Sequence, residues 1–277
     1  MTSSLPTDYW GRVAYLASHY ASSFLSGAWK TVIIALVGTF IGCLIGFLVG
    51  IVQTIPVSAK DPLYKKALLK FVRAVLNIYV EVFRGTPMMV QAMFIYFGAL
   101  QYTSLKLTMW SAAFLIVSIN TGAYMAETVR GGILSIDIGQ TEGAKAIGMS
   151  HFQTMLYVIL PQALRNIMPQ IGNNFIINVK DTSVMFIIGF QDFFAVHKMV
   201  SGAIFKYFPS ALLEMGGYLF LTLLASFLLR RLEKKLQGNP NYELVNTDQL
   251  VMTAGTYSYA GTAPYEEKSR DYQGGNS

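Results

Sequence analysis

Long uncharged apolar stretches alternate with short charged segments along this chain. A membrane-spanning helix needs about 20 mostly apolar residues, and several stretches approach or exceed that length: 31–59, 85–105, 107–126, 155–190 and 211–229. The fourth stretch contains prolines and charged residues, so its boundaries are the least well defined. The pattern predicts an all-α, polytopic transmembrane bundle with about five spans.

Two further segments have apolar residues at helical spacing. Residues 6–26 are predicted to form an amphipathic helix on the outer membrane surface, and the basic segment 61–80 a second one on the inner surface. After residue 236 the apolar period is lost. We therefore expect an amphipathic segment (1–26), a transmembrane domain (27–236) and a disordered cytoplasmic tail (237–277).

The basic residues between the apolar stretches predict an orientation. They are numerous between the first two stretches, where Lys60 and Arg73 mark the ends of the basic run. Only Lys106 separates the second and third stretches, and basic residues return before the fourth stretch and after the fifth. The positive-inside rule then places the N-terminus outside and the C-terminus in the cytoplasm, in agreement with an odd number of spans.

The composition supports a membrane protein and excludes other classes. Charged residues make up 13% of the 277 residues, against about 25% in soluble proteins. The net charge of +6 comes from scattered residues and not from one basic face, so we expect no nucleic-acid binding. A single cysteine, Cys43, permits no intrachain disulfide, and the histidines lack metal-ligand spacing, so no metal site is expected. The N-terminal residues do not have the pattern of a cleavable signal peptide.

Four glycines recur at every fourth position within the first apolar stretch. Gly38, Gly42, Gly46 and Gly50 would form one stripe on a helix. Such a stripe lets a second helix approach closely. Helix packing is the main interpretation, and a substrate path along the glycine face is the alternative.

A short helix is predicted within one cytoplasmic loop, from Thr141 to Ile147. It would expose Glu142 and several small residues, and Gly148 is placed to end it. Pro161 then interrupts the next segment. An exposed helix of this kind suits the docking of another protein, although an ordinary loop helix has the same pattern.

The spacing in this loop resembles the EAA motif of ABC importer permeases. The motif reads EAA, three residues, Gly, nine residues, Ile, one residue and Leu-Pro; here Gly143 and Val158 depart from it. In that family the motif forms a coupling helix that docks in a groove of the ATPase subunit. The resemblance implies a coupling helix at 141–150 and a coupling role for these residues: Glu142, Gly143, Ala144, Gly148, Leu160 and Pro161.

Three longer segments resemble the histidine/glutamine-type permeases of polar amino acids: 79–98, 120–133 and 173–189. The resemblance implies the ABC type I importer transmembrane fold in the bacterial plasma (inner) membrane. It also implies several partners: a second permease subunit, identical or homologous, a cytoplasmic ATPase dimer, an extracytoplasmic substrate-binding protein and membrane lipid. The chain would hold no cofactor itself, because the ATPase subunits would bind ATP and Mg²⁺.

Polar residues at membrane depth are costly and usually face a cavity or a partner. Thr86 precedes Pro87, which suits a first helical position, and the free amides at such a start can hold a carboxylate. Asn120, Glu127 and Asp181 could receive an ammonium group. These four residues are the predicted substrate-binding set. The alternative is structural, with Arg84 paired to Glu81, and Lys180 paired to Asp181.

The chain contains no Gly-Lys dipeptide and therefore no phosphate-binding loop of the usual kind. We expect a transport subunit that is not an enzyme and draws energy from elsewhere. An ATP-driven amino-acid importer is the leading hypothesis. The alternatives are a secondary amino-acid transporter driven by an ion gradient, and a membrane scaffold or sensor.

Overall fold

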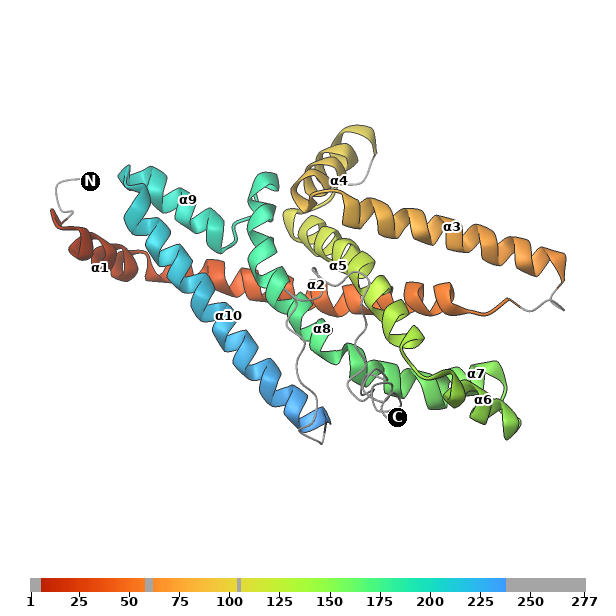
Figure 1. The fold of residues 1–277 in the computed structure, drawn as a ribbon. Coiled ribbons are helices and arrows are strands. Elements are labelled where there is room, and N and C mark those ends of the chain that lie inside the picture. Colours follow the sequence, from red (N-terminus) through yellow and green to blue (C-terminus); the bar gives the residue numbers. More distant parts are fainter. Residues whose placement is uncertain (1–5, 58–61, 104–105, 238–277) are drawn as a thin grey trace, which may run out of the picture. The chain divides into compact units, whose positions relative to one another are not determined.

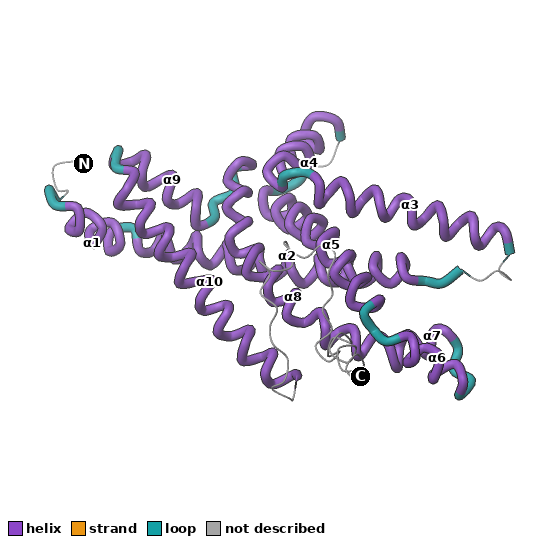
Figure 2. Tube along the Cα trace, in the orientation of Figure 1, coloured by secondary structure: helices purple, strands orange, loops and turns teal. Residues whose placement is uncertain are grey.

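A computed structural model describes residues 6–57, 62–103 and 106–237 (Figure 1). Helices account for all the regular elements in these ranges, and Figure 2 shows helix and loop but no strand there. The all-α prediction is confirmed for this part of the chain. The predicted tail lies outside the described residues, except for residue 237.

The described elements follow one another in this order: α1 (Tyr9–His19), α2 (Ala21–Thr54), α3 (Leu63–Gly85), α4 (Met88–Tyr102), α5 (Met109–Leu134), α6 (Ile138–Ala146), α7 (His151–Gln153), the π-helical η1 (Thr154–Ile159), α8 (Leu160–Asp181), the 3₁₀ turn η2 (Thr182–Ile188), α9 (Phe193–Ile204) and α10 (Tyr207–Gln237).

Helices α2 and α5 pack along each other and form the centre of the bundle. The glycine stripe of α2 faces Val117, Thr121, Met125 and Val129 of α5. An ideal Cβ on Gly42 would lie 2.6 Å from the Thr121 Cβ, closer than real side chains approach. The packing interpretation of the stripe is therefore confirmed, and α5 covers the face along which a substrate path was considered.

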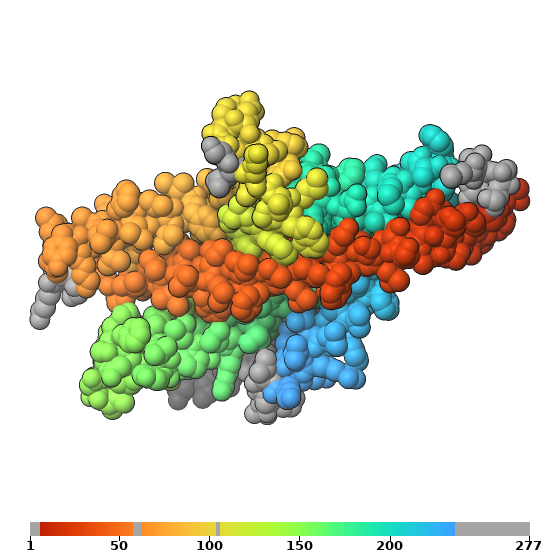
Figure 3. Space-filling view, turned by 180° about the vertical axis from the view of Figure 1, so that it is seen from behind, coloured from red at the N-terminus to blue at the C-terminus, as the bar shows by residue number. Residues whose placement is uncertain are grey.

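The opposite side of α2 is apolar and uncovered. Leu36, Phe40, Leu44 and Leu48 are all more than half exposed. Figure 3 shows α2, coloured red to orange, running uncovered across this face of the molecule. In a membrane protein such a face is suited to contact with lipid chains.

Fewer helices are long enough to span a membrane than the five that the sequence predicted. Within the described ranges, three helices are long and apolar enough, namely α2, α5 and α10. The bent pair 151–188 and 193–204, with an angle of 54°, makes a fourth if it counts as one broken span. Stretch 85–105 forms only the 15-residue α4, about 22 Å long, because the chain breaks between α3 and α4. The count of five and the orientation remain predictions.

The N-terminal boundary differs from the prediction. The α1 helix ends at His19, and α2 begins at Ala21, so the expected boundary at residue 26 falls inside a helix. The first turns of α2 are held by burial of Phe24 and Gly27 against the segment around Phe193. Residues 21–30, which are uncharged except for Lys30, therefore extend the first long helix instead of forming a separate surface segment.

Helix α3 is also part of the bundle and not only a surface helix. Its residue Val80 is buried, and the Tyr79 hydroxyl donates to the Ile119 carbonyl of α5 at 2.7 Å. The basic residues at the start of α3 suggested a surface helix, but the helix continues to Gly85 and packs against α5.

The long fourth stretch breaks at a place that its prolines do not mark. Helix α8 accommodates Pro161 in its first turn and Pro169 in its interior and continues to Asp181. The chain then continues as the 3₁₀ helix η2, which is followed by its C-cap residue Gly189 at a φ of 83°. This turn packs against α4 and brings the end of α8 beside the α3–α4 break.

Candidate functional site

A cavity of about 460 Å³ lies where the α3–α4 break meets α5 and α8. Three of the four predicted substrate residues line it: Thr86 at the break, Asn120 on α5 and Asp181 at the end of α8. Arg84 and Tyr124 also line this cavity. We call it the break cavity. Its walls come from three segments that are far apart in the sequence.

The α3–α4 break is held open by two side-chain amides. Gln91 donates to the carbonyls of Phe83 and Thr86, both at 2.9 Å, and to Thr86 Oγ1 at 2.8 Å. Asn120 donates to Gln91 Oε1 at 2.9 Å and to the Phe83 carbonyl at 3.1 Å. These bonds satisfy carbonyl groups that the end of a helix leaves without partners.

The NH₂ group of the Asn120 side chain thus helps to shape the cavity, whereas the Oδ1 of the same side chain accepts no hydrogen bond from the described residues. This oxygen remains available to a donor in the cavity. The sequence analysis did not identify Gln91, although it is a buried polar residue in an apolar stretch and could have been recognised by that signal.

Helix α8 contributes a second set of amides that the prediction missed. Asn178 is buried and donates to Thr39 Oγ1 at 2.8 Å and to Thr121 Oγ1 at 2.9 Å. Both Asn178 and Thr121 line the break cavity. This network joins α2, α5 and α8 at the level of the cavity, and Asn174 lines the wall one turn earlier.

Glu127 does not join the other three predicted residues. It lies in a neighbouring cavity and forms an ion pair with Arg84, which lines both cavities. The expected alternative pairing of Arg84 with Glu81 does not occur among the described residues. The Arg84 guanidinium also lies 5.6 Å from the ring centre of Tyr124, a cation–π contact.

Asp181 ends α8 and faces the break cavity, half-buried. No ion pair joins it to Lys180 in the part of the chain that the structure describes. The structural alternative for Asp181 therefore lacks the contact that it required.

Helix α6 coincides with the predicted docking helix but begins three residues earlier, at Ile138. It exposes Glu142 and Gly143 and buries Ala144. The helix is followed by Gly148 at φ of 80°, where the Gly148 and Met149 amides bond back to the carbonyls of Lys145 and Ala144 at 2.9 and 3.1 Å. This pair of backbone hydrogen bonds is a Schellman C-cap, so the predicted stop at Gly148 is confirmed.

Leu160 and Pro161 lie in the first turn of α8, beyond the π-helical turn η1. Leu160 packs on the cluster that includes Met125 and Val129 of α5. Gln162 Nε2 lies 3.3 Å from Gln140 Oε1 of α6, and α6 packs against η1. Leu160 of the motif thus connects α8 to α5, and the two glutamines connect α8 to α6. Figure 1 shows α6 and α7 at the end of the bundle opposite α1.

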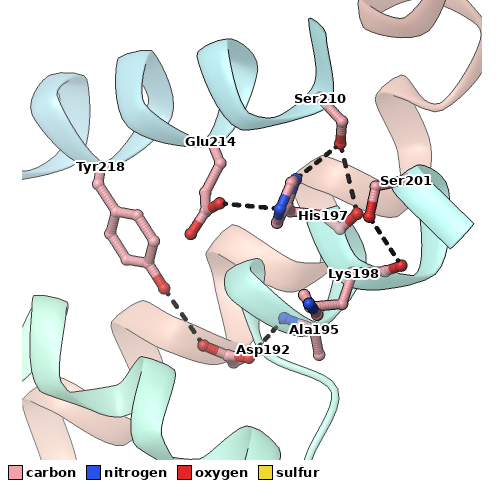
Figure 4. A network of polar contacts seen from close by, with 8 residues as sticks. All are labelled: Asp192, Ala195, His197, Lys198, Ser201, Ser210, Glu214 and Tyr218. Atoms are coloured by element: carbon pink, nitrogen blue, oxygen red, sulfur yellow. Dashed lines mark hydrogen bonds and ion pairs between the residues drawn. The ribbon is translucent and has the colours of Figure 1, made fainter. Parts of the chain in front are cut away.

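A separate polar cluster joins α9 to α10 (Figure 4). Asp192 is fully buried and accepts from the Ala195 amide at 2.9 Å and from the Tyr218 hydroxyl at 3.2 Å. His197, also fully buried, has Nδ1 2.9 Å from Ser210 Oγ and Nε2 3.6 Å from Glu214 Oε2. The cluster fastens the short α9 to the long α10. The sequence analysis noted Glu214 only as an acid in an apolar stretch.

A helical membrane bundle with a broken, polar-lined interior and a short helix projecting at one end defines a membrane-embedded permease subunit. Residues 66–238 match the family described as "Binding-protein-dependent transport system inner membrane component", and the chain belongs to this family. It is therefore an inner-membrane subunit of an ABC transporter.

Relatives and solved structures agree with this assignment. The chain is 40% identical to the glutamine transport system permease protein GlnP of Escherichia coli (strain K12) over 161 residues, 58% of this chain and 74% of the relative. It is 36% identical to a putative GlnP of Rickettsia typhi, over 60% of this chain and 77% of the relative.

Two solved structures share the fold. The crystal structure of an amino acid ABC transporter with histidines covers 83% of this chain and 99% of its own, with a TM-score of 0.70 and 31% identity. The MetNI methionine ABC transporter, in an inward-facing conformation, gives a TM-score of 0.58 at 22% identity over 77% of this chain and 95% of its own, which shows the fold alone.

Proposed function

We propose that this chain is the transmembrane subunit of an ATP-driven importer of polar amino acids. The relatives named for glutamine transport, and the solved transporter named for amino acids, support the substrate class. Two permease chains, identical or homologous, would enclose the path. Separate ATPase subunits would bind ATP and Mg²⁺, and an extracytoplasmic binding protein would deliver the substrate.

The α6 helix would transmit motion from the ATPase. It is short, exposed and closed by a fixed C-cap, and it contacts η1 directly. Through η1 and the first turn of α8, a displacement of α6 reaches the helix that ends at Asp181 in the break cavity. Helices move as stiff units, so this connection would link nucleotide-driven docking to the cavity.

The break cavity offers partners for both charges of an α-amino acid. The first amides of α4 lie at a helix start, which favours a carboxylate. Thr86 lines this start, and its hydroxyl donates to the Val82 carbonyl at 2.7 Å. The Asp181 carboxylate and the free Asn120 Oδ1 accept hydrogen bonds and suit an ammonium group. The convergence of Thr86, Asn120 and Asp181 in one cavity is the observation that carries the proposal.

The test is uptake of L-[³H]glutamine, L-histidine and L-arginine into proteoliposomes that contain the complete transporter and its binding protein. ATP-dependent uptake of at least one of them that survives a protonophore is expected. Uptake abolished by the protonophore at constant ATP would overturn the proposal and favour the ion-driven transporter.

A further inference from the structure

A second cavity, of about 570 Å³, lies between α2, α3 and α5. We call it the basic cavity, because three arginines and two glutamates line it: Arg73, Arg84, Arg130, Glu81 and Glu127. Gln53 and Asn77 complete its polar surface. In a chain with only 13% charged residues, five ionisable side chains around one cavity are a marked concentration.

Helix α3 presents this polarity as a regular stripe. Arg73, Asn77, Glu81 and Arg84 recur at intervals of four, four and three residues, so they lie on one side of the helix. All four line the basic cavity. Such a stripe on a bundle helix needs a compensating polar environment, because charged groups at membrane depth are costly.

Pairing within the protein compensates only part of this charge. Glu127 is paired with Arg84 and lies 3.8 Å from Arg130 Nη2. By contrast, Glu81 is exposed and has no hydrogen-bond or ion-pair partner among the described residues, and Arg73 donates from Nη2 to the Ile55 carbonyl. The cavity therefore holds one carboxylate without a protein partner, on Glu81, and the guanidinium groups of Arg73 and Arg130 keep N–H groups beyond those that contact the Ile55 carbonyl and Glu127.

The free Glu81 carboxylate and the remaining guanidinium N–H groups suit the two charges of an α-amino acid zwitterion. Two guanidinium groups can bind its carboxylate, and the Glu81 carboxylate can bind its ammonium group. Gln53 Nε2 donates to Asn77 Oδ1 at 2.9 Å, which leaves the Asn77 amide hydrogens and the Gln53 oxygen for a polar side chain.

The basic cavity lies on the α6 side of the break cavity. Arg130 follows Asn120 by ten residues on α5, a rise of about 15 Å toward the end that leads into α6. Arg84 lines both cavities, and its pair with Glu127 stands at their boundary. A substrate that leaves the break cavity toward α6 would meet the basic cavity next.

We propose that the basic cavity is a second, weaker site for the transported amino acid, filled from the side of the membrane that carries α6. This inference rests on the proposed function for the identity of the ligand. The site is weaker because its ion-paired side chains are 35–44% exposed, and water screens charges in such positions. Product would occupy it when the amino acid accumulates on that side.

The experiment is equilibrium binding of L-[³H]glutamine, L-histidine and L-arginine, each tested separately, to the complete transporter in nanodiscs without its binding protein. Two phases per permease subunit are expected, the second at least tenfold weaker. Glu81→Gln and Arg130→Gln should weaken the second phase at least tenfold and leave the first within twofold. Asp181→Asn should do the reverse. Arg165→Gln, at an exposed arginine of α8 that lines neither cavity, should change neither phase.

A single phase that neither Glu81→Gln nor Arg130→Gln alters would overturn the second site and leave the proposed function intact. Equal weakening of both phases by Arg130→Gln would also overturn it, because the two cavities would then act as one site. No saturable binding of any of the three amino acids, together with no uptake, would reject the proposed function itself. Size-exclusion profiles matching the wild type would show that the variants remain folded.

Discussion

Asn120 of α5 donates its side-chain amide to Gln91 Oε1 of α4 at 2.9 Å and to the Phe83 carbonyl of α3 at 3.1 Å. One side chain thus bonds to residues on both sides of the α3–α4 break. The break keeps its shape because Asn120 and Gln91 satisfy the exposed carbonyls, and Asn120 also lines the break cavity. The residue predicted as a ligand also has a structural role.

Asp181→Asn should raise the apparent KM for uptake about tenfold with a smaller change in kcat. The substitution replaces a charge-assisted hydrogen bond to the ammonium group by a neutral one, a loss of roughly 1–2 kcal/mol. Initial rates in proteoliposomes measure the effect. The matched control is Asp8→Asn at the start of α1, which should leave KM unchanged. An unchanged KM in Asp181→Asn would remove this residue from the substrate site.

Gly148→Ala should reduce substrate-stimulated ATPase activity. Its φ of 80° costs a residue with a Cβ about 1–2 kcal/mol, so the C-cap of α6 would rearrange. Gly202→Ala in α9 is the matched control, because its added Cβ meets nothing within 4 Å, alanine favours a helix by roughly 0.5–1 kcal/mol, and the position lies outside the coupling residues. Equal coupling in the two variants would contradict the role given to the cap.

Gly46→Ala should destabilise the bundle by about 1–3 kcal/mol. Its Cβ would lie 2.8 Å from the Met125 carbonyl carbon and 2.9 Å from the Ala126 nitrogen, and backbone atoms yield less readily than side chains. Cys43 is the single cysteine and is buried, so a thiol-reactive dye reports unfolding as temperature rises. Gly98→Ala, which meets no atom within 4 Å, should keep the wild-type Tm.

Tyr218→Phe should lower the stability of the α9–α10 contact by about 1–3 kcal/mol. The change removes the hydroxyl that donates to the fully buried Asp192 and leaves that carboxylate oxygen without its donor. The same dye assay on Cys43 measures it. Tyr157→Phe, at a tyrosine that is 68% exposed, controls for loss of a hydroxyl. Identical melting of the two variants would show that the Asp192 contact adds no stability.

The predicted orientation places Lys145 in the cytoplasm and Lys106 outside. Both side chains are exposed. Single cysteines introduced at each position in a Cys43→Ser background should react with an impermeant maleimide from opposite sides. Labelling of Lys145→Cys in intact cells would reject the coupling role of α6, because the ATPase subunits are cytoplasmic.

Local patterns predicted the features that depend on a few neighbouring residues. The glycine stripe and the stop at Gly148 each follow from backbone geometry that the residue type fixes. The helix start predicted at Pro87 is one residue early, because Pro87 is the N-cap and α4 begins at Met88. The chemistry of polar residues at membrane depth grouped Thr86, Asn120 and Asp181 as substrate ligands, a role that stays a prediction. The structure brings these three residues to one cavity, and that meeting is a tertiary fact.

The missed features depend on contacts between distant segments. Glu127 was placed with the other ligands by its chemistry, but its position on α5 turns it toward the basic cavity and Arg84. The fourth stretch breaks at η2 because that turn packs against α4, and a proline pattern does not report such packing. The bond between Asn178 and Thr39 joins residues 139 positions apart, which no local period shows.

The length of α2 relates these sites to depth in the bilayer. Its 34 residues extend about 51 Å, well beyond a hydrocarbon core of about 30 Å. The exposed Trp29 suits one headgroup boundary. Thr39, ten residues further, then lies about 15 Å deeper, at the middle of a bilayer crossed without tilt, and it bonds to Asn178 in the wall of the break cavity. Gln53 lies about 36 Å from Trp29, past the far edge of the hydrocarbon and within the headgroup region. The basic cavity would therefore reach from the Arg84–Glu127 pair beside the break cavity to the polar boundary of the bilayer.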